Sequence, residues 1–178
     1  MLTWSEVRRL IVASTRDALA SRGFNNPGVS TWRFRQDFID VIEFRSPRQG
    51  ILAVEFGCDL RDWCRQNPKP HHCGFRVHPA YAFDWPSTVS FSFQNSIEEQ
   101  LCQLNRLRHH LLLAVETWFV HFATVDSALA SLQNNVFGTQ NEVTMCSTGS
   151  VAFQELERRL MRARTGLKVR PNGESASS

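Results

Sequence analysis

The stretch from Thr31 to Cys58 places the strongest constraint on the fold, because its pattern is typical of three consecutive β-strands. Apolar and basic residues alternate in TWRFR, which predicts a half-buried strand over residues 31–35. The run from Phe38 to Phe44 is denser in apolar and β-branched residues. This density predicts a second strand that is covered on both faces and lies at the centre of a sheet.

The connection after this central strand predicts a reversal of the chain. The segment from Ser46 to Gly50 contains Pro47, which fixes φ, and ends in a glycine, which permits a positive φ. Such a connection favours a third strand, from Ile51 to Cys58, that runs antiparallel to the second. The three strands together predict an antiparallel β-meander.

Helical patterns lie on both sides of the meander. Thr3 and Glu6 have capping-box spacing and predict a first helix, which Gly23 ends. A second capping box, at Ser96 and Glu99, opens the longest helical pattern of the chain. We expect both helices to pack on the sheet.

Two further helices are predicted towards the end of the chain. Thr124 and Asp126 are typical helix-start residues, so a break near Phe122 should precede a shorter helix through Leu132. The last helical pattern is amphipathic, with Phe153, Leu156 and Leu160 facing inward and Arg158, Arg159, Arg162 and Arg164 facing outward.

The segment from Asp59 to Pro86 has no clear periodicity and is rich in proline. Its one strand-like piece is Cys73 to His78. Thr88 to Gln94 alternates apolar and polar residues, which indicates either another strand or an extended segment laid over the core.

Composition indicates one globular domain. A chain of 178 residues with 42% hydrophobic residues can bury a sizeable core. We expect an α+β domain over residues 1–165, in which an antiparallel meander is packed by an N-terminal helix and a C-terminal group of helices, and a flexible tail over residues 166–178. The five cysteines and the lack of about 18 consecutive apolar residues predict reduced thiols, no membrane association and a cytoplasmic location.

The order of these features resembles an uncharacterised bacterial family, the domain of unknown function 4304 (DUF4304-like), over about Leu10 to Leu132. Arg45 stands where that pattern has a glutamine. The resemblance implies an α+β fold, no catalytic residues and a role in bacterial defence or toxin immunity. It is carried by Gly23-Phe24, Trp32 and Phe34, the strand from Phe38 to Ser46, Gly57, Arg76, Trp85, the segment Glu116 to Phe119, and Ser127 to Leu132.

One cluster of cysteine and histidine residues offers ligands that Zn²⁺ prefers. The candidate ligands are Cys64, His71, Cys73 and His78, with Cys58 and His72 nearby. No Cys-x-x-Cys pair is present, so buried strand cysteines and surface histidines are the simpler interpretation. Cys58 in particular falls on the apolar face of its strand.

Two acidic residues on neighbouring strands, Asp40 and Glu55, offer an alternative site that would share a Mg²⁺ ion in a hydrolase or nuclease. The lysine that usually follows the second acid by two residues is absent, because Gly57 occupies that position. Acids in strands are more often paired with arginines, and here the obvious partners are Arg33, Arg35 and Arg45.

A serine or cysteine nucleophile could meet His109, His110 or His121, but the sequence has no Gly-x-Ser-x-Gly elbow. The basic helix near the C-terminus could grip nucleic-acid phosphates or an acidic protein. A solvated helix face is the simpler interpretation of that charge.

With no complete catalytic motif, the sequence favours a non-enzymatic interaction domain that has no cofactor and binds another protein. Metal-dependent hydrolysis, with Zn or Mg, and nucleic-acid binding through the basic helix are the alternatives. The residues expected to contact the partner are Trp63, Arg76, Trp85, Arg158 and Arg162.

Overall fold

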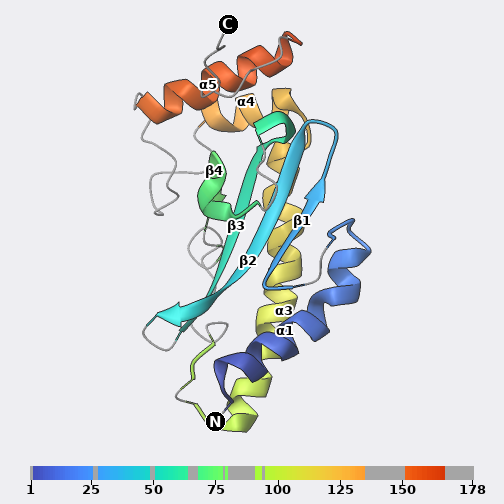
Figure 1. Ribbon diagram of the computed structural model, residues 1–178, viewed down its shortest axis with the longest axis vertical. Coiled ribbons are helices and arrows are strands. Elements are labelled where there is room, and N and C mark those ends of the chain that lie inside the picture. Colours follow the sequence, from blue (N-terminus) through green and yellow to red (C-terminus); the bar gives the residue numbers. More distant parts are fainter. Residues whose placement is uncertain are drawn as a thin grey trace, which may run out of the picture.

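The computed structural model describes residues 2–25, 28–48, 51–63, 68–77, 79, 91–93, 95–134 and 151–166. The fold combines an N-terminal helix, an antiparallel sheet and C-terminal helices (Figure 1), which confirms the predicted α+β class. The elements are α1 (Trp4–Ala20), β1 (Ser30–Phe34), β2 (Phe38–Arg48), β3 (Ile51–Leu60), η1 (Arg61–Trp63), η2 (Pro70–His72), β4 (Phe75–Val77), α3 (Ile97–Phe119), η4 (Val120–Phe122), α4 (Val125–Gln133) and α5 (Val151–Arg164).

The sheet has four antiparallel strands in the order β1-β2-β3-β4. The predicted meander is therefore confirmed, and β4 extends it by a short edge strand. β2 continues to Arg48, beyond the predicted turn, and its register with β3 shifts between Arg45 and Arg48. Pro47 lies in this irregular part, where the loss of a backbone donor is tolerated.

The inner face of the sheet packs against α3 and η4. Phe56 of β3 lies 5.8 Å from Trp118 and 5.3 Å from Phe119, measured between ring centroids. Phe38 of β2 meets Phe122 at 6.2 Å. In Figure 1, α3 runs behind the sheet along its length. These aromatic pairs place the main core between the sheet and the helices.

The outer face of the sheet is covered in part by η2, which crosses β3 at Gly57. A Cβ atom at Gly57 would lie 2.6 Å from Cα of Pro70 and 2.8 Å from Sγ of Cys73. Only a residue without a side chain permits this close approach. Ile39 and Val41 of β2 also face outward and are buried, so the central strand is covered on both faces as expected.

The helix boundaries follow the local signals in the sequence. Thr3 and Ser96 make the predicted capping boxes, and Gly23 ends the first helix with a positive φ of 81°. The predicted break near Phe122 is the turn η4, after which Thr124 caps α4.

Phe91 is buried and its ring lies 4.9 Å from that of Phe93, as expected for two residues of one face. Within the described residues 91–93, only an isolated bridge at Ser92 has strand-like pairing. The predicted flexible tail lies outside the described residues from residue 167 onward.

Across the described part of the chain, no single helix is long and apolar enough to cross a membrane. Residues 97–122 and 125–133 pass the same length and composition test only as a pair, bent by 96°.

Candidate functional site

A group of charged side chains occupies the outer face of the sheet, and we call it the outer-face cluster: Glu43, Arg45, Glu55, Lys69 and His71. The register of β2 and β3 sets Glu43 directly opposite Glu55. Arg45 joins the two carboxylates, with Nε 3.3 Å from Oε2 of Glu43 and Nη1 2.7 Å from Oε1 of Glu55. Because two acids opposite each other would repel, Arg45 is what allows this pair to form.

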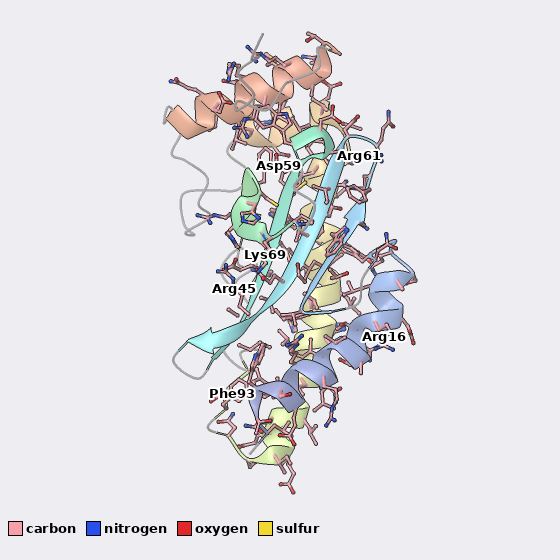
Figure 2. The ribbon with its side chains drawn as sticks, viewed as in Figure 1. Arg16, Arg45, Asp59, Arg61, Lys69 and Phe93 are labelled. Carbon is pink, nitrogen blue, oxygen red and sulfur yellow. The ribbon has the colours of Figure 1, made fainter. Side chains whose placement is uncertain are left out.

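The segment around η2 completes the outer-face cluster. Nζ of Lys69 lies 3.7 Å from Oε1 of Glu43, and Nη2 of Arg45 donates to Nδ1 of His71 at 3.2 Å. The Glu43 side chain is only 10% exposed, whereas those of Arg45 and Lys69 are 39% and 48% exposed. The cluster therefore has a nearly buried carboxylate, Glu43, beneath cations that face the solvent. Figure 2 shows Arg45 and Lys69 close together beside β3.

The structure does not bring Asp40 and Glu55 together. Asp40 pairs with Cys58 in the sheet register and Glu55 pairs with Glu43, so the two acids project from opposite faces. Asp40 is fully buried and bound by Nε of Arg33 at 2.7 Å and Nη2 of Arg35 at 2.5 Å. The arrangement matches the arginine pairing that the sequence suggested, and it leaves no shared cation site between the two carboxylates.

Cys58 lies beside Asp40 on the inner face and is fully buried. Its Sγ donates to Oδ1 of Asp40 at 3.4 Å. Burial, followed by the adjacent Asp40 carboxylate, raises the pKa of the Cys58 thiol well above its usual range. A buried thiol held neutral in this way is not a nucleophile or a metal ligand.

Of the four candidate zinc ligands of the alternative interpretation, His71 and Cys73 are in the described part of the chain, and Cys64 and His78 are outside it. His71 contacts Arg45, a cation, and Sγ of Cys73 donates to the Lys69 carbonyl at 3.5 Å. The described residues contain no group of three or more His, Cys, Asp or Glu side chains arranged to hold a metal ion.

One serine does meet a histidine. Oγ of Ser131, on α4, lies 3.2 Å from Nδ1 of His121, on η4. Desolvation lowers the pKa of His121, which suits a neutral imidazole as acceptor. Ser131 is buried, however, so this pair joins two helices rather than facing a substrate.

A second group of residues, which we call the α5 joint, attaches α5 to the end of the sheet: Asp59, Trp63, Gly74, Leu156 and Arg159. The Arg159 guanidinium lies 3.8 Å from the centre of the Trp63 ring. The sequence predicted that Arg159 faces outward and that Trp63 contacts a partner, but the two residues contact each other. The role of Asp59 in this contact was not predicted, although its alternation with Glu55 and Gly57 would have placed it on the outer face.

The basic face of α5 is largely paired within the molecule. Glu155 binds Arg158 at 2.5 Å and Arg159 at 2.8 Å, and Asp126 of α4 binds Arg164 at 2.9 Å. Arg162 is exposed and forms no ion pair with another described residue. These pairs reduce the positive charge that α5 offers to nucleic acid.

Two predicted partner-binding residues remain. Arg76 of β4 is the register partner of Gly57, so it lies on the outer face beside the cluster, half-buried. Trp85 lies outside the described residues.

The fold and its surface define an α+β domain with a mixed-charge cluster on one sheet face and a terminal helix docked at the end of that sheet. Comparison of the chain with protein-family models, curated proteins and solved structures finds no match. The resemblance to the DUF4304-like family stays a prediction.

Proposed function

We propose that this protein is a non-enzymatic interaction domain that binds another protein through the outer-face cluster. The carrying observation is the arrangement of that cluster, in which the Glu43 carboxylate is nearly buried, Glu55 is partly exposed, and the cations of Arg45 and Lys69 reach solvent. Charges held in fixed positions on a surface select a complementary partner and speed its approach.

The alternatives have less support. A shared Mg²⁺ site at Asp40 and Glu55 would need both carboxylates on one face of the sheet, and they project from opposite faces. Nucleic-acid binding through α5 would need unpaired arginines, and Glu155 and Asp126 pair with three of them: Arg158, Arg159 and Arg164. A setting in bacterial defence, with a toxin as the partner, rests on the family resemblance alone.

The test compares one change inside the outer-face cluster with the same type of change elsewhere. Lys69→Glu reverses an exposed charge at the rim of the cluster, and Arg16→Glu reverses an exposed charge on α1, away from the cluster (Figure 2). We expect Lys69→Glu to weaken partner binding by about tenfold or more, since like charges brought together at an interface cost on the order of 1–3 kcal/mol.

The measurement is affinity purification from the native host with the wild-type chain and both variants, followed by titration of any protein that is captured. A protein retained by the wild type and by Arg16→Glu, and lost with Lys69→Glu, supports the proposal. Equal binding by all three chains contradicts it, as does cleavage of nucleic acid in the presence of Mg²⁺ by the purified wild type.

A further inference from the structure

Asp59 is a buried carboxylate located at the point where α5 meets the sheet. Its Oδ1 accepts a hydrogen bond from the Leu60 amide at 2.9 Å, and its Oδ2 accepts one from the Gly74 amide at 3.1 Å. The residue is 6% exposed. Figure 2 shows it at the end of β3 that lies nearest to α5.

Leu156 of α5 closes the space around this carboxylate. A Cβ atom at Gly74 would lie 2.4 Å from Cδ2 of Leu156 and 3.6 Å from Oδ1 of Asp59. The leucine methyl group, the glycine and the carboxylate therefore meet at one point. Because α5 supplies the apolar cover, withdrawal of this helix would return Asp59 to water.

The charged groups around Asp59 do not neutralise it by direct contact. Arg159 is the cation on α5 whose charge acts on Asp59, but it stacks on Trp63 and pairs with Glu155. Arg61 and Asp62 of η1 are exposed, and among the described residues no salt bridge to Asp59 is formed. Nε1 of Trp63 is also buried at the joint, without a hydrogen-bond partner among the described residues.

We propose that α5 is a releasable helix whose docking weakens when Asp59 ionises, so that rising pH uncovers Trp63 and the turn at Gly74. Release would solvate the Asp59 carboxylate, which two amide hydrogen bonds hold without a counter-ion, and the Trp63 indole nitrogen, which has no hydrogen-bond partner among the described residues. The cost of release is the exposure of Leu156 and Leu160. Burial of apolar side chains therefore stabilises the docked state of α5, and the burial of polar groups destabilises it to an extent that depends on pH.

The direction of the effect follows from the pKa of Asp59. Burial raises this pKa from 3.8 to about 6, against the opposing effects of the Leu60 and Gly74 amides and of Arg159. A raised pKa means that the docked state favours the neutral acid. Docking is therefore strongest below about pH 3.8, weakens as pH rises from 3.8 to about 6, and stays weak above that value.

Hydrogen–deuterium exchange of the full chain at pH 5 and pH 8, corrected for the intrinsic exchange rate, tests the proposal. An undocked 14-residue helix is too short to stay folded alone, so release removes its amide protection. We expect peptides from α5 to lose about tenfold in protection between the two pH values, while peptides from α1 and α3 keep theirs. A loss shared equally by α1, α3 and α5, or no loss in α5, overturns the proposal.

Three substitutions make the test more specific. Asp59→Asn should abolish the pH response of α5, while Asp62→Asn, at an exposed acid three residues away, should keep it. Gly74→Ala places a methyl group against the flexible end of Leu156 and should lower the protection of α5 at both pH values without a change in α1. A full pH response in Asp59→Asn contradicts the assignment of the switch to this residue.

Discussion

Asp40 is a buried acid with two arginine partners. One lies on β1, and the other is the residue directly after that strand. The pair of contacts, to Arg33 and to Arg35, neutralises a carboxylate that would otherwise be very costly to bury. Arg33 in turn lies 4.7 Å from the centre of the Phe24 ring, so the ion pair extends into the aromatic core. At the scale of single residues, this acid is therefore structural.

Removal of the Asp40 charge should destabilise the fold strongly. Asp40→Asn leaves two partly buried arginines without their counter-ion, which typically costs about 3 kcal/mol or more. Asp62→Asn, at an exposed position, should change the free energy of unfolding by less than about 0.5 kcal/mol. Urea denaturation of both variants provides the measurement, and equal midpoints would show that Asp40 is not a structural acid.

The pairing of the strand acids with arginines could largely be predicted from the sequence. The arginines at positions 33, 35 and 45 were the expected partners of the strand acids, and they are. The assignment of Asp40 and Glu55 to one shared site failed because sequence alternation gives each strand two faces but does not state which residue of one strand pairs with which residue of the next. That register became known only from the structure.

At the scale of elements, η2 is the segment that shapes the outer-face cluster. It brings Lys69 and His71 over the strands because Pro70 can lie directly on Gly57. This segment could not be predicted from a periodic pattern, since a short 3₁₀ turn has no pattern to recognise. The regular helices, in contrast, were predictable from their capping boxes.

The same substitution at two glycines should loosen two different elements. Gly57→Ala forces a methyl group against the backbone of Pro70 and should cost about 2 kcal/mol or more, with faster amide exchange in residues 68–77. Gly74→Ala meets only the flexible end of Leu156, so its global cost should be smaller and its effect confined to α5. Urea denaturation and peptide-resolved exchange distinguish the two variants, and an equal loss of stability would contradict the role given to η2.

At the scale of the whole molecule, the inner core is one continuous cluster that joins α1, the sheet, α3, α4 and α5. Apart from Leu156 and Leu160, which α5 contributes, this core opens only when the entire domain unfolds. Sequence patterns predicted the apolar faces of the strands and helices that form it, because these faces repeat with fixed periods. They could not predict how α5 docks, since that contact depends on the three-dimensional meeting of Asp59, Gly74 and Leu156.

Cysteine reactivity should report this global opening. Cys102 is exposed on α3, while Cys58 is buried with a raised pKa. In native protein at pH 8, alkylation should modify Cys102 rapidly and Cys58 only at the rate of global unfolding, so the two rates differ by about 10³-fold or more. Peptide mass spectrometry after timed alkylation gives both rates, and comparable rates would show that the core opens locally.

The opposite orientations of Asp40 and Glu43 on β2 have a consequence for how the sheet finds its pairing during folding. In the native alignment each acid meets its own arginines, Arg33 and Arg35 on one face and Arg45 on the other. A slip of one residue would turn Asp40 outward, away from Arg33 and Arg35. The same slip would carry Glu43 and Arg45, which lie on one strand, together into the apolar core, where charged groups are costly. The two carboxylates therefore penalise strand pairings that are out of register.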